Sequence, residues 1–240
     1  MTVLFLTFGG PTQDFYNAVN RICNEATTFN IFDNIIGKTD IDLKTDEDFW
    51  SKHGSFLQSN RRGYGYWLWK PYLVKKQLEI MNDNDILVYA DAGCTLNILG
   101  KSRLQEYIQL ANYDSGIVSF QMTHLEYRWT KMDVFEYLNA KDNIDTGQIA
   151  ATAFILRKCS SSVNLVDQWY NTCCNYDLIN DSKSRALNHP AFSEHRHDQS
   201  IWSILNKKYM TYIIPDETWF TDFHKDGINF PIWATRKKYG

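Results

Sequence analysis

Residues 61–97 read RRGYGYWLWKPYLVKKQLEIMNDNDILVYADAGCTLN, and this stretch decides the fold. Pro71 suits the first turn of a helix, where the N–H that proline lacks would have no partner in any case. Val74, Leu78 and Met81 follow it at helical spacing and share one face. The stretch therefore predicts a helix with one apolar stripe, preceded by a loop rich in glycine, arginine and tryptophan.

A strand is predicted directly after this helix. Residues 82–85 have the composition of a turn, and residues 86–90 form a short apolar run, typical of a strand covered on both faces in an α/β sheet. Asp91 stands where the strand should end, and the small residues Ala92 and Gly93 follow it. Because ligands of open α/β sheets collect beyond the carboxyl ends of the strands, a carboxylate at this position can approach a ligand or a metal ion.

The length and the charge of the chain limit what it can be. Its 240 residues, 44% of them hydrophobic, suit one large domain, and no repeat, linker or low-complexity tract divides them. A net charge of −3 argues against general binding to nucleic acid. An anionic ligand must therefore be held by a local cluster of cations.

The cysteines and the lengths of the apolar segments indicate in which compartment the protein resides. The five cysteines lack CxxC spacing, and Cys23, Cys159 and Cys173 lie in apolar segments, which favours reduced thiols in a cytosol-like compartment. The opening MTVLFLTFGG is too short and uncharged for a signal peptide, and no apolar run approaches the length of a membrane span. We therefore expect a cytoplasmic protein without a membrane span.

The beginning of the chain predicts a strand followed by a helix. Residues 3–8 form the strand, which ends at Gly9 and Gly10, and Thr12 can cap the helix. The inner face of that helix contains Phe15, Val19, Ile22 and Ala26. The dinucleotide fingerprint GxGxxG is absent, so a Rossmann cofactor site is not supported. The two glycines still allow the backbone to approach a nucleotide.

The rest of the chain alternates between strand and helix signals, which predicts an α/β fold. Thr130 with Asp133 three residues later resembles a capping box, and Asp198 can cap the last helix. Residues 175–197 form a polar connection long enough to be a functional loop. Strands are expected near residues 30–36, 116–121, 149–156 and 209–214, and helices near 104–111, 134–138, 163–173 and 198–205.

Cations and a carboxylate together favour transfer of a group from a phosphate-bearing donor. Arg61, Arg62 and Lys70 lie in one glycine-broken segment, and such cations neutralise the charge that develops on a departing phosphate. Asp91 offers a hard oxygen ligand for Mn²⁺ or Mg²⁺. His224, within FHKDG, is a candidate for a further metal ligand because its segment follows the last strand and can fold back over the site.

These residues resemble a known family. RRGYGYWLWKPY followed by DILVYADAG, then QIAATAFILRK and HDQS, resembles the GT-A-fold nucleotide-sugar glycosyltransferases of large DNA viruses and bacterial polysaccharide loci. Those enzymes are distantly similar to glycogenin and the lipopolysaccharide galactosyltransferases. The resemblance implies a single GT-A-like domain over residues 1–240, with a central, mostly parallel mixed sheet flanked by helices. It also implies a UDP-sugar donor, a divalent cation and a glycan or glycoconjugate acceptor, in the cytoplasm of a bacterium or of a virus-infected cell.

The resemblance implies donor-binding roles position by position. Asp91 corresponds to the first acid of the family's DxD metal motif, with Ala92 after it. Gly93 stands where the pattern has a second acid, and this departure removes a metal ligand. The other donor-binding positions lie on the first-strand loop, on the donor-facing turn and at the helix start: Thr7, Phe8, Gly9, Arg62, Trp67 and Lys70.

The resemblance also implies catalytic residues and a second metal ligand. Asp198 and Gln199 correspond to an Asp-Gln pair near the reacting sugar carbon, and His224 to a C-terminal histidine that ligates metal in some relatives. If transfer inverts the anomeric carbon, Asp198 is the general base. If it retains the configuration, Gln199 stabilises positive charge at the sugar, and the similarity of the Asp-Gln pair favours retention.

Plainer explanations stand beside several of these roles. An Asp-Ala-Gly sequence after a strand is commonly only a turn. Asp198 is explained by helix capping alone. Trp67 and Trp69 would both point to one side of an extended segment, either as core residues or as a platform for a sugar.

Two other functional classes are compatible with the same residues. Gly93 suits a catalytically silent module that binds a nucleotide or a sugar. A sugar nucleotidyltransferase is the other alternative, although that reaction favours a lysine in the first loop and TFGGPTQD has none.

Overall fold

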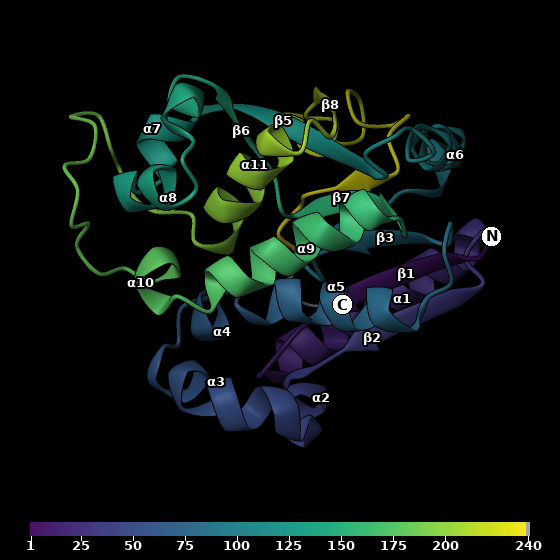
Figure 1. Cartoon of the computed structure of the whole chain (residues 1–240). Helices are drawn as coiled ribbons and strands as arrows, with labels where there is room; N and C mark the ends of the chain where they lie inside the picture. Colours follow the sequence, from purple (N-terminus) through teal and green to yellow (C-terminus); the bar gives the residue numbers. More distant parts are fainter. Residues whose placement is uncertain (239–240) are drawn as a thin grey trace.

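A seven-stranded mixed sheet forms the centre of the computed structural model, which describes residues 1–238 (Figure 1). Its strand order is β2-β1-β3-β7-β5-β6, with β8 also paired to β5. Because β6 and β7 run opposite to the other five strands, the sheet is mostly parallel. The strands are β1 (Val3–Phe8), β2 (Asn34–Lys38), β3 (Ile86–Ala90), β5 (Ile117–Leu125), β6 (Gly147–Ile149), β7 (Ala153–Arg157) and β8 (Tyr212–Pro215).

Helices connect and cover these strands. They are α1 (Gln13–Phe29), α2 (Asp40–Thr45), α3 (Glu47–Ser59), α4 (Gly63–Tyr66), α5 (Trp69–Ile80), α6 (Lys101–Leu110), α7 (Glu126–Trp129), α8 (Met132–Tyr137), α9 (Ser160–Cys173), α10 (Tyr176–Ile179) and α11 (Asp198–Lys208). Two short 3-10 helices add η1 (Ile98–Gly100) and η2 (Lys141–Asn143). No helix within residues 1–238 has the length and apolar composition that crossing a membrane requires.

Both faces of the sheet are covered, as the sequence of β3 predicts. Leu87 and Tyr89 belong to the core that includes residues of α5, α9 and α11. Ile86, Val88 and Ala90 belong to a second core, which includes residues of α1 and α6. Since alternate side chains of a strand point to opposite faces, a strand buried on both sides has an unbroken apolar run. The fold is therefore a three-layer α/β arrangement.

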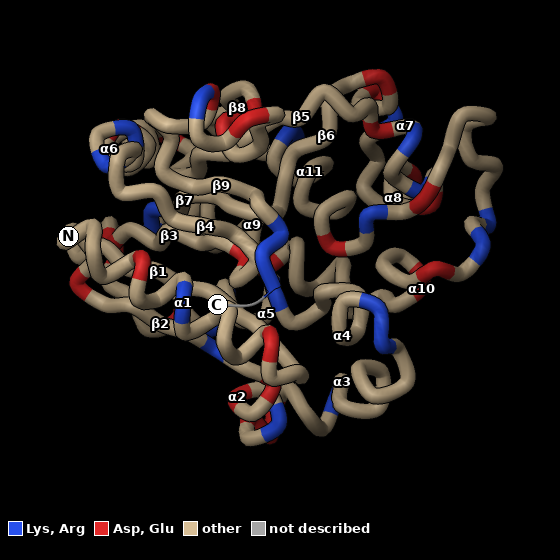
Figure 2. Tube along the Cα trace, turned by 180° about the vertical axis from the view of Figure 1, so that it is seen from behind, with Lys and Arg blue, Asp and Glu red and all other residues tan. Residues whose placement is uncertain are grey.

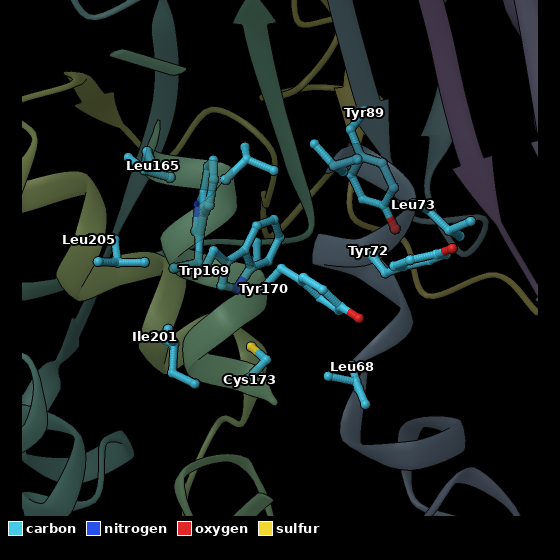
Figure 3. Packing of buried hydrophobic residues seen from close by; sticks show 14 of the residues in the cluster. Leu68, Tyr72, Leu73, Tyr89, Leu165, Trp169, Tyr170, Cys173, Ile201 and Leu205 are labelled. Atoms are coloured by element: carbon cyan, nitrogen blue, oxygen red, sulfur yellow. The ribbon is translucent and has the colours of Figure 1, made fainter. Parts of the chain in front are cut away.

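Large aromatic side chains fill the first of these cores. The rings of Trp169 in α9 and Trp202 in α11 have their centres 4.6 Å apart, and Phe154 of β7 lies 4.5 Å from Trp202. Figure 3 shows Trp169 and Tyr170 between side chains of α5 and side chains of α11. This packing holds the first turns of α5 and α11 in fixed positions relative to the sheet.

Several helix starts differ from the predictions. Helix α5 begins at Trp69, so that Pro71 is its third residue, where a missing N–H is still tolerated. Helix α11 begins at Asp198, with His197 and not Asp198 at the N-cap position. Thr12 does occupy the N-cap of α1, but its side chain makes no capping hydrogen bond.

The predicted capping box at residues 130–133 is wrong. Helix α8 begins at Met132, and its N-cap residue Lys131 makes no side-chain capping bond. The carboxylate of Asp133 instead accepts hydrogen bonds from the backbone N–H groups of Arg185 and Ala186. The spacing of Thr130 and Asp133 resembles a capping box, but the partners of Asp133 come from the loop that contains Arg185 and Ala186.

The end of the chain forms a strand that its irregular sequence does not predict. Ile232–Trp233 (β9) pairs antiparallel with Thr95–Leu96 (β4), which lies shortly after Asp91. The C-terminal segment is thereby brought back to the carboxyl end of β3. All five cysteines are free.

Candidate active site

Lys70, Asp91 and Asp198 form the centre of the candidate site. The Nζ atom of Lys70 lies 3.0 Å from Oδ1 of Asp91 and 3.6 Å from Oδ2 of Asp198. The same ammonium donates a hydrogen bond to the carbonyl of Ala151 at 3.0 Å. The hydroxyl of Tyr89 donates to Oδ1 of Asp91 at 2.7 Å. One ammonium group thus joins two carboxylates from distant parts of the chain.

Three elements place these side chains at one strand end. Asp91 directly follows β3, Lys70 is the second residue of α5, and Asp198 is the first residue of α11. The backbone N–H of Asp91 donates to the carbonyl of Thr152 at 2.9 Å, and that of Cys94 donates to the carbonyl of Asp91 at 2.8 Å, which closes the turn. The carboxyl end of a parallel strand therefore carries the site, as is usual in open α/β sheets.

Burial sets the protonation behaviour of these groups. The side chain of Lys70 is 3% exposed and that of Asp91 is 29% exposed. Burial raises the pKa of Asp198 to about 7, with Lys70 opposing the shift and Asp91 adding to it. Burial alone would lower the pKa of Lys70, but the two carboxylates raise it above its usual value. In this triangle of Lys70, Asp91 and Asp198, the buried ammonium of Lys70 therefore keeps its positive charge at neutral pH, while the pKa of Asp198 is about 7.

One oxygen of the triangle lacks a partner. Oδ2 of Asp198 is buried, and no group within residues 1–238 makes a hydrogen bond to it. Its contact with Lys70 at 3.6 Å is longer than a hydrogen bond. A buried carboxylate oxygen left unpaired costs free energy, and such groups commonly mark a ligand site. The hydroxyl of a bound sugar has the chemistry to satisfy it.

Gln199 follows Asp198 in the chain, and its side chain is held by one backbone and one side-chain partner. Its Oε1 accepts from the backbone N–H of Ala151 at 3.2 Å, and its Nε2 donates to Oε1 of Gln148 at 2.9 Å. Ala151 links Lys70 to Gln199, because its carbonyl accepts from Lys70 and its N–H donates to Gln199. The amide of Gln199 is therefore fixed in orientation.

The glycine-rich turn before α5 is folded in an unusual way. Tyr64, Tyr66 and Trp67 have φ values of 50°, 52° and 61°, and Gly63 and Gly65 also have positive φ. Non-glycine residues seldom adopt this region, and each costs of order 1–3 kcal/mol. The segment is therefore not extended, and the expectation that Trp67 and Trp69 share one side of an extended chain is wrong.

The two tryptophans of this turn have different surroundings. Trp69 is buried and stacks on Phe8 of β1 with ring centres 4.0 Å apart. Trp67 is half-buried and stacks on His197, the residue before Asp198, at 5.4 Å. Trp69 is thus a core residue, whereas Trp67 connects the turn to the segment that carries Asp198 and Gln199.

Arg62 is held at the surface by two carboxylates. Its guanidinium lies 3.2 Å from Oδ1 of Asp181 and 3.0 Å from Oε2 of Glu194. The other oxygen of Glu194 lies 3.1 Å from the guanidinium of Arg196. The structure thus places Arg62 beside the loop that leads to Asp198, next to a second arginine.

The first-strand positions lie inside the molecule. Thr7 and Phe8 are buried, with 0% and 4% of their surfaces exposed. Gly9 packs so closely on α1 that a Cβ atom would stand 2.7 Å from the carbonyl oxygen of Phe15. The side chains of Thr7 and Phe8 are therefore buried at the end of β1, the strand that pairs with β3 beside Asp91.

The residues present do not fit the divalent cation that the fold family implies. No three His, Cys, Asp or Glu side chains of residues 1–238 are grouped closely enough to hold a metal ion. Oδ1 of Asp91 already accepts from the hydroxyl of Tyr89 at 2.7 Å and lies 3.0 Å from the ammonium of Lys70, and this ammonium would repel a divalent ion bound to the same oxygen. Gly93 adds no carboxylate, and His224 is exposed, with its ring edge against Trp233.

Two surface cavities lie elsewhere. They have volumes of about 240 and 380 Å³, and both are lined by Gln77 and Ile80 beside β2. Neither is lined by Lys70, Asp91 or Asp198. The candidate site is defined here by its charged groups.

The sequence interpretation missed the partners of the turn after β3. Arg21 of α1 donates to the carbonyls of Ala92 at 2.8 Å and Cys94 at 2.9 Å. It also donates to the carbonyl of Lys237 at 3.2 Å. Nothing near Arg21 in the sequence marks this role, but the basic run at residues 236–238 was a visible charge signal.

Neither protein-family models nor curated proteins match the sequence. Solved structures do resemble the fold. The crystal structure of a glycosyltransferase involved in the glycosylation of the major capsid of PBCV-1 has a TM-score of 0.51 and 9% sequence identity, and the similarity covers 97% of this chain and 92% of that one. The chain therefore has the GT-A-like fold of that enzyme class. At this identity the similarity concerns the fold alone.

Two further solved structures are more distant. The apo form of mouse xyloside xylosyltransferase 1 has a TM-score of 0.47 at 8% identity and covers 94% of this chain and 89% of its own. The galactosyltransferase LgtC, in complex with donor and acceptor sugar analogs, has a TM-score of 0.44 at 12% identity, covering 100% of this chain and 84% of its own. With TM-scores below 0.5, these two similarities support no conclusion of their own.

Proposed function

We propose that this protein is a glycosyltransferase that moves a sugar from a UDP-type nucleotide sugar to a glycan or glycoconjugate acceptor. The GT-A-like fold supports the class of reaction. The observation that carries the proposal is the buried Lys70 between Asp91 and Asp198, with an unsatisfied carboxylate oxygen at the carboxyl end of a central strand. Such a group of acceptors and one donor suits the hydroxyls of a sugar.

The triangle binds the transferred sugar in this proposal. Oδ2 of Asp198 accepts a hydrogen bond from one sugar hydroxyl, and the exposed part of Asp91 accepts from another. Lys70 orients both carboxylates, because its ammonium lies against each of them. The sugar is then fixed before the acceptor arrives, which lowers the entropic part of the barrier.

The surroundings of Asp198 favour retention of the anomeric configuration. The side chain of Asp198 is only 4% exposed, and this proposal assigns its free oxygen to a hydroxyl of the donor sugar. Asp198 is then not the general base for the acceptor hydroxyl. Gln199 is held through Ala151 and Gln148 with its carbonyl oxygen and amide in fixed directions. In the proposed mechanism Gln199 stabilises the positive charge that develops at the sugar.

Replacement of Asp91 by asparagine tests the proposal. Asp91→Asn keeps the size of the side chain but removes its charge, and we expect UDP-sugar turnover to fall at least about 100-fold. The melting temperature should change by only a few degrees, because Lys70 keeps Asp198 as a partner. Asp83→Asn, in the exposed turn before β3, is the matched control. Full turnover in Asp91→Asn would rule out the assigned role.

Binding without turnover would separate the remaining classes. A thermal-shift series of nucleoside diphosphates and triphosphates, with and without Mn²⁺, should show stabilisation by uridine diphosphate for a glycosyltransferase. A silent binding module would bind the same ligand but release no sugar. A nucleotidyltransferase would instead be stabilised most by a triphosphate.

A further inference from the structure

The diphosphate of a nucleotide-sugar donor needs positive charge in the candidate site, and this inference therefore rests on the proposed function. The charge of Lys70 is already matched by Asp91 and Asp198. A divalent cation does not fit the ligands around Asp91, as described above. The cations that face the diphosphate must therefore come from other parts of the chain.

The C-terminal segment brings basic residues to the turn after β3. The backbone N–H of Lys237 donates to the carbonyl of Gly93 at 2.8 Å, and the hydroxyl of Thr235 donates to the same oxygen at 3.2 Å. The Cα of Arg236 would lie 3.6 Å from a Cβ atom placed on Gly93. Arg236 therefore lies directly over Gly93 with an exposed side chain. Figure 2 shows this basic C-terminal stretch, in blue, running between β9 and α5.

Arg196 lies on the neighbouring loop, two residues before Asp198. Its guanidinium lies 4.2 Å from the ring centre of Trp129 and 3.1 Å from Glu194. Burial lowers the pKa of Arg196, Glu194 opposes this, and the charges of Arg236 and Arg62 lower it further. Arg62 and Arg196 therefore share Glu194, and Arg196 also feels the charge of Arg236 from the C-terminal segment.

Such a convergence of like charges costs free energy unless an anion or carboxylates neutralise it. Here Glu194 uses both of its oxygens, one for Arg62 and one for Arg196. Glu194 thus forms ion pairs with both arginines. A diphosphate offers more oxygens, and planar guanidinium groups bind phosphate through paired hydrogen bonds.

We propose that Arg196 and Arg236, together with Arg62, bind the diphosphate of the donor, so that donor binding needs no divalent cation. On binding, the diphosphate replaces Glu194 as the partner of Arg62 and Arg196. Arg236 closes the site from the side of Gly93.

Calorimetry with inorganic pyrophosphate and with uridine diphosphate, in excess EDTA and then with Mn²⁺, tests this inference. Wild-type protein should bind both ligands in EDTA, with affinities within about threefold of those in Mn²⁺. Arg196→Gln and Arg236→Gln should each weaken pyrophosphate binding at least about tenfold, because each removes a charge-assisted contact. Arg185→Gln is the matched control, since Arg185 lies in the same long loop but pairs with Asp177.

The outcomes separate this inference from the proposed function. Binding of uridine diphosphate only with Mn²⁺, together with wild-type affinity in Arg196→Gln and Arg236→Gln, would overturn the inference and leave the glycosyltransferase proposal standing. Binding of pyrophosphate in EDTA, lost in both variants, with no binding of any nucleoside diphosphate, would support the anion site and overturn the proposed donor. Absence of binding by either ligand would overturn both.

Glu194→Gln provides a test with the opposite sign. Removal of this carboxylate frees Arg196 and leaves Arg62 with Asp181 alone, so we expect pyrophosphate to bind several-fold more tightly than in wild type. Misfolding cannot produce a gain in affinity. Unchanged or weaker binding in Glu194→Gln would contradict the competition between Glu194 and the diphosphate.

Discussion

At the scale of single residues, the site depends on one buried ammonium. Lys70 is 3% exposed and has two carboxylate neighbours and one carbonyl. Burying a charge is costly, and pairing with hydrogen bonds compensates for this cost. The same residue therefore connects the stability of the fold to the chemistry of the site.

Replacement of Lys70 by methionine tests this connection. We expect Lys70→Met to lower the free energy of unfolding by about 3 kcal/mol, because removal of one member of a buried pair leaves carboxylates without their counter-charge. Lys76→Met, at an exposed ion pair with Glu79, should change it by less than about 0.5 kcal/mol. Denaturant unfolding measures both variants, and equal effects would contradict the special position of Lys70.

Asp198 should make stability depend on pH. Its pKa rises from 3.8 in the unfolded chain to about 7 in the fold, so that the folded state holds a proton that the unfolded state releases. The stabilising contribution is present below about pH 4 and is lost as the pH rises through about 7. Measured between pH 4 and 8, the difference in free energy of unfolding between wild type and Asp198→Asn should fall with rising pH. A flat difference would show that burial does not shift this carboxyl.

At the scale of elements, local patterns predicted central strands such as β3 and long helices such as α9, but not helices α2 and α3. The strand expected over residues 149–156 is broken at residues 150–152 into β6 and β7. Strand β3 could be predicted because all of residues 86–90 are buried, and a strand buried on both faces has an unbroken apolar run in its own sequence. The turn at residues 63–67 could not be predicted, since Tyr64, Tyr66 and Trp67 adopt positive φ only because packing on distant residues such as His197 compensates for it.

The same distinction applies to the candidate site. Asp91 could be predicted because a carboxylate after a buried strand is visible in the sequence. Its contact with Lys70 depends on how α5 packs, and the link between Arg21 and the C-terminal segment depends on contacts between opposite ends of the chain. Such long-range contacts leave no local pattern.

Gly63 should tolerate no side chain. A Cβ atom at this position would stand 2.2 Å from the ring of Trp67, and its φ of 56° is itself unfavourable for other residues. We expect Gly63→Ala to destabilise the fold by about 2 kcal/mol. Gly93→Ala is the matched control, because its nearest neighbour would be 3.6 Å away. Equal melting temperatures for the two variants would contradict the described turn.

At the scale of the whole molecule, Arg21 joins the two ends of the chain at the site. One guanidinium contacts the carbonyls of Ala92, Cys94 and Lys237, so that α1, the turn after β3 and the C-terminal segment are held together. The proposed diphosphate site is therefore assembled only when the full chain has folded.

Arg21→Gln should loosen this assembly without unfolding the protein. Hydrogen exchange at the backbone N–H of Lys237, which donates to Gly93, should accelerate at least about tenfold, because the segment loses one of its anchors. Exchange within β3 should not change. Equal protection of Lys237 in the variant and in wild type would show that Arg21 does not hold the C-terminal segment.

The central claim is that Lys70, Asp91 and Asp198 hold the sugar of a nucleotide-sugar donor. A crystal structure of the protein with a non-hydrolysable UDP-sugar tests it most directly. We predict a sugar hydroxyl at about 3 Å from Oδ2 of Asp198, the oxygen that has no partner within residues 1–238. A donor bound elsewhere, with Asp198 Oδ2 still unpaired, would contradict the claim.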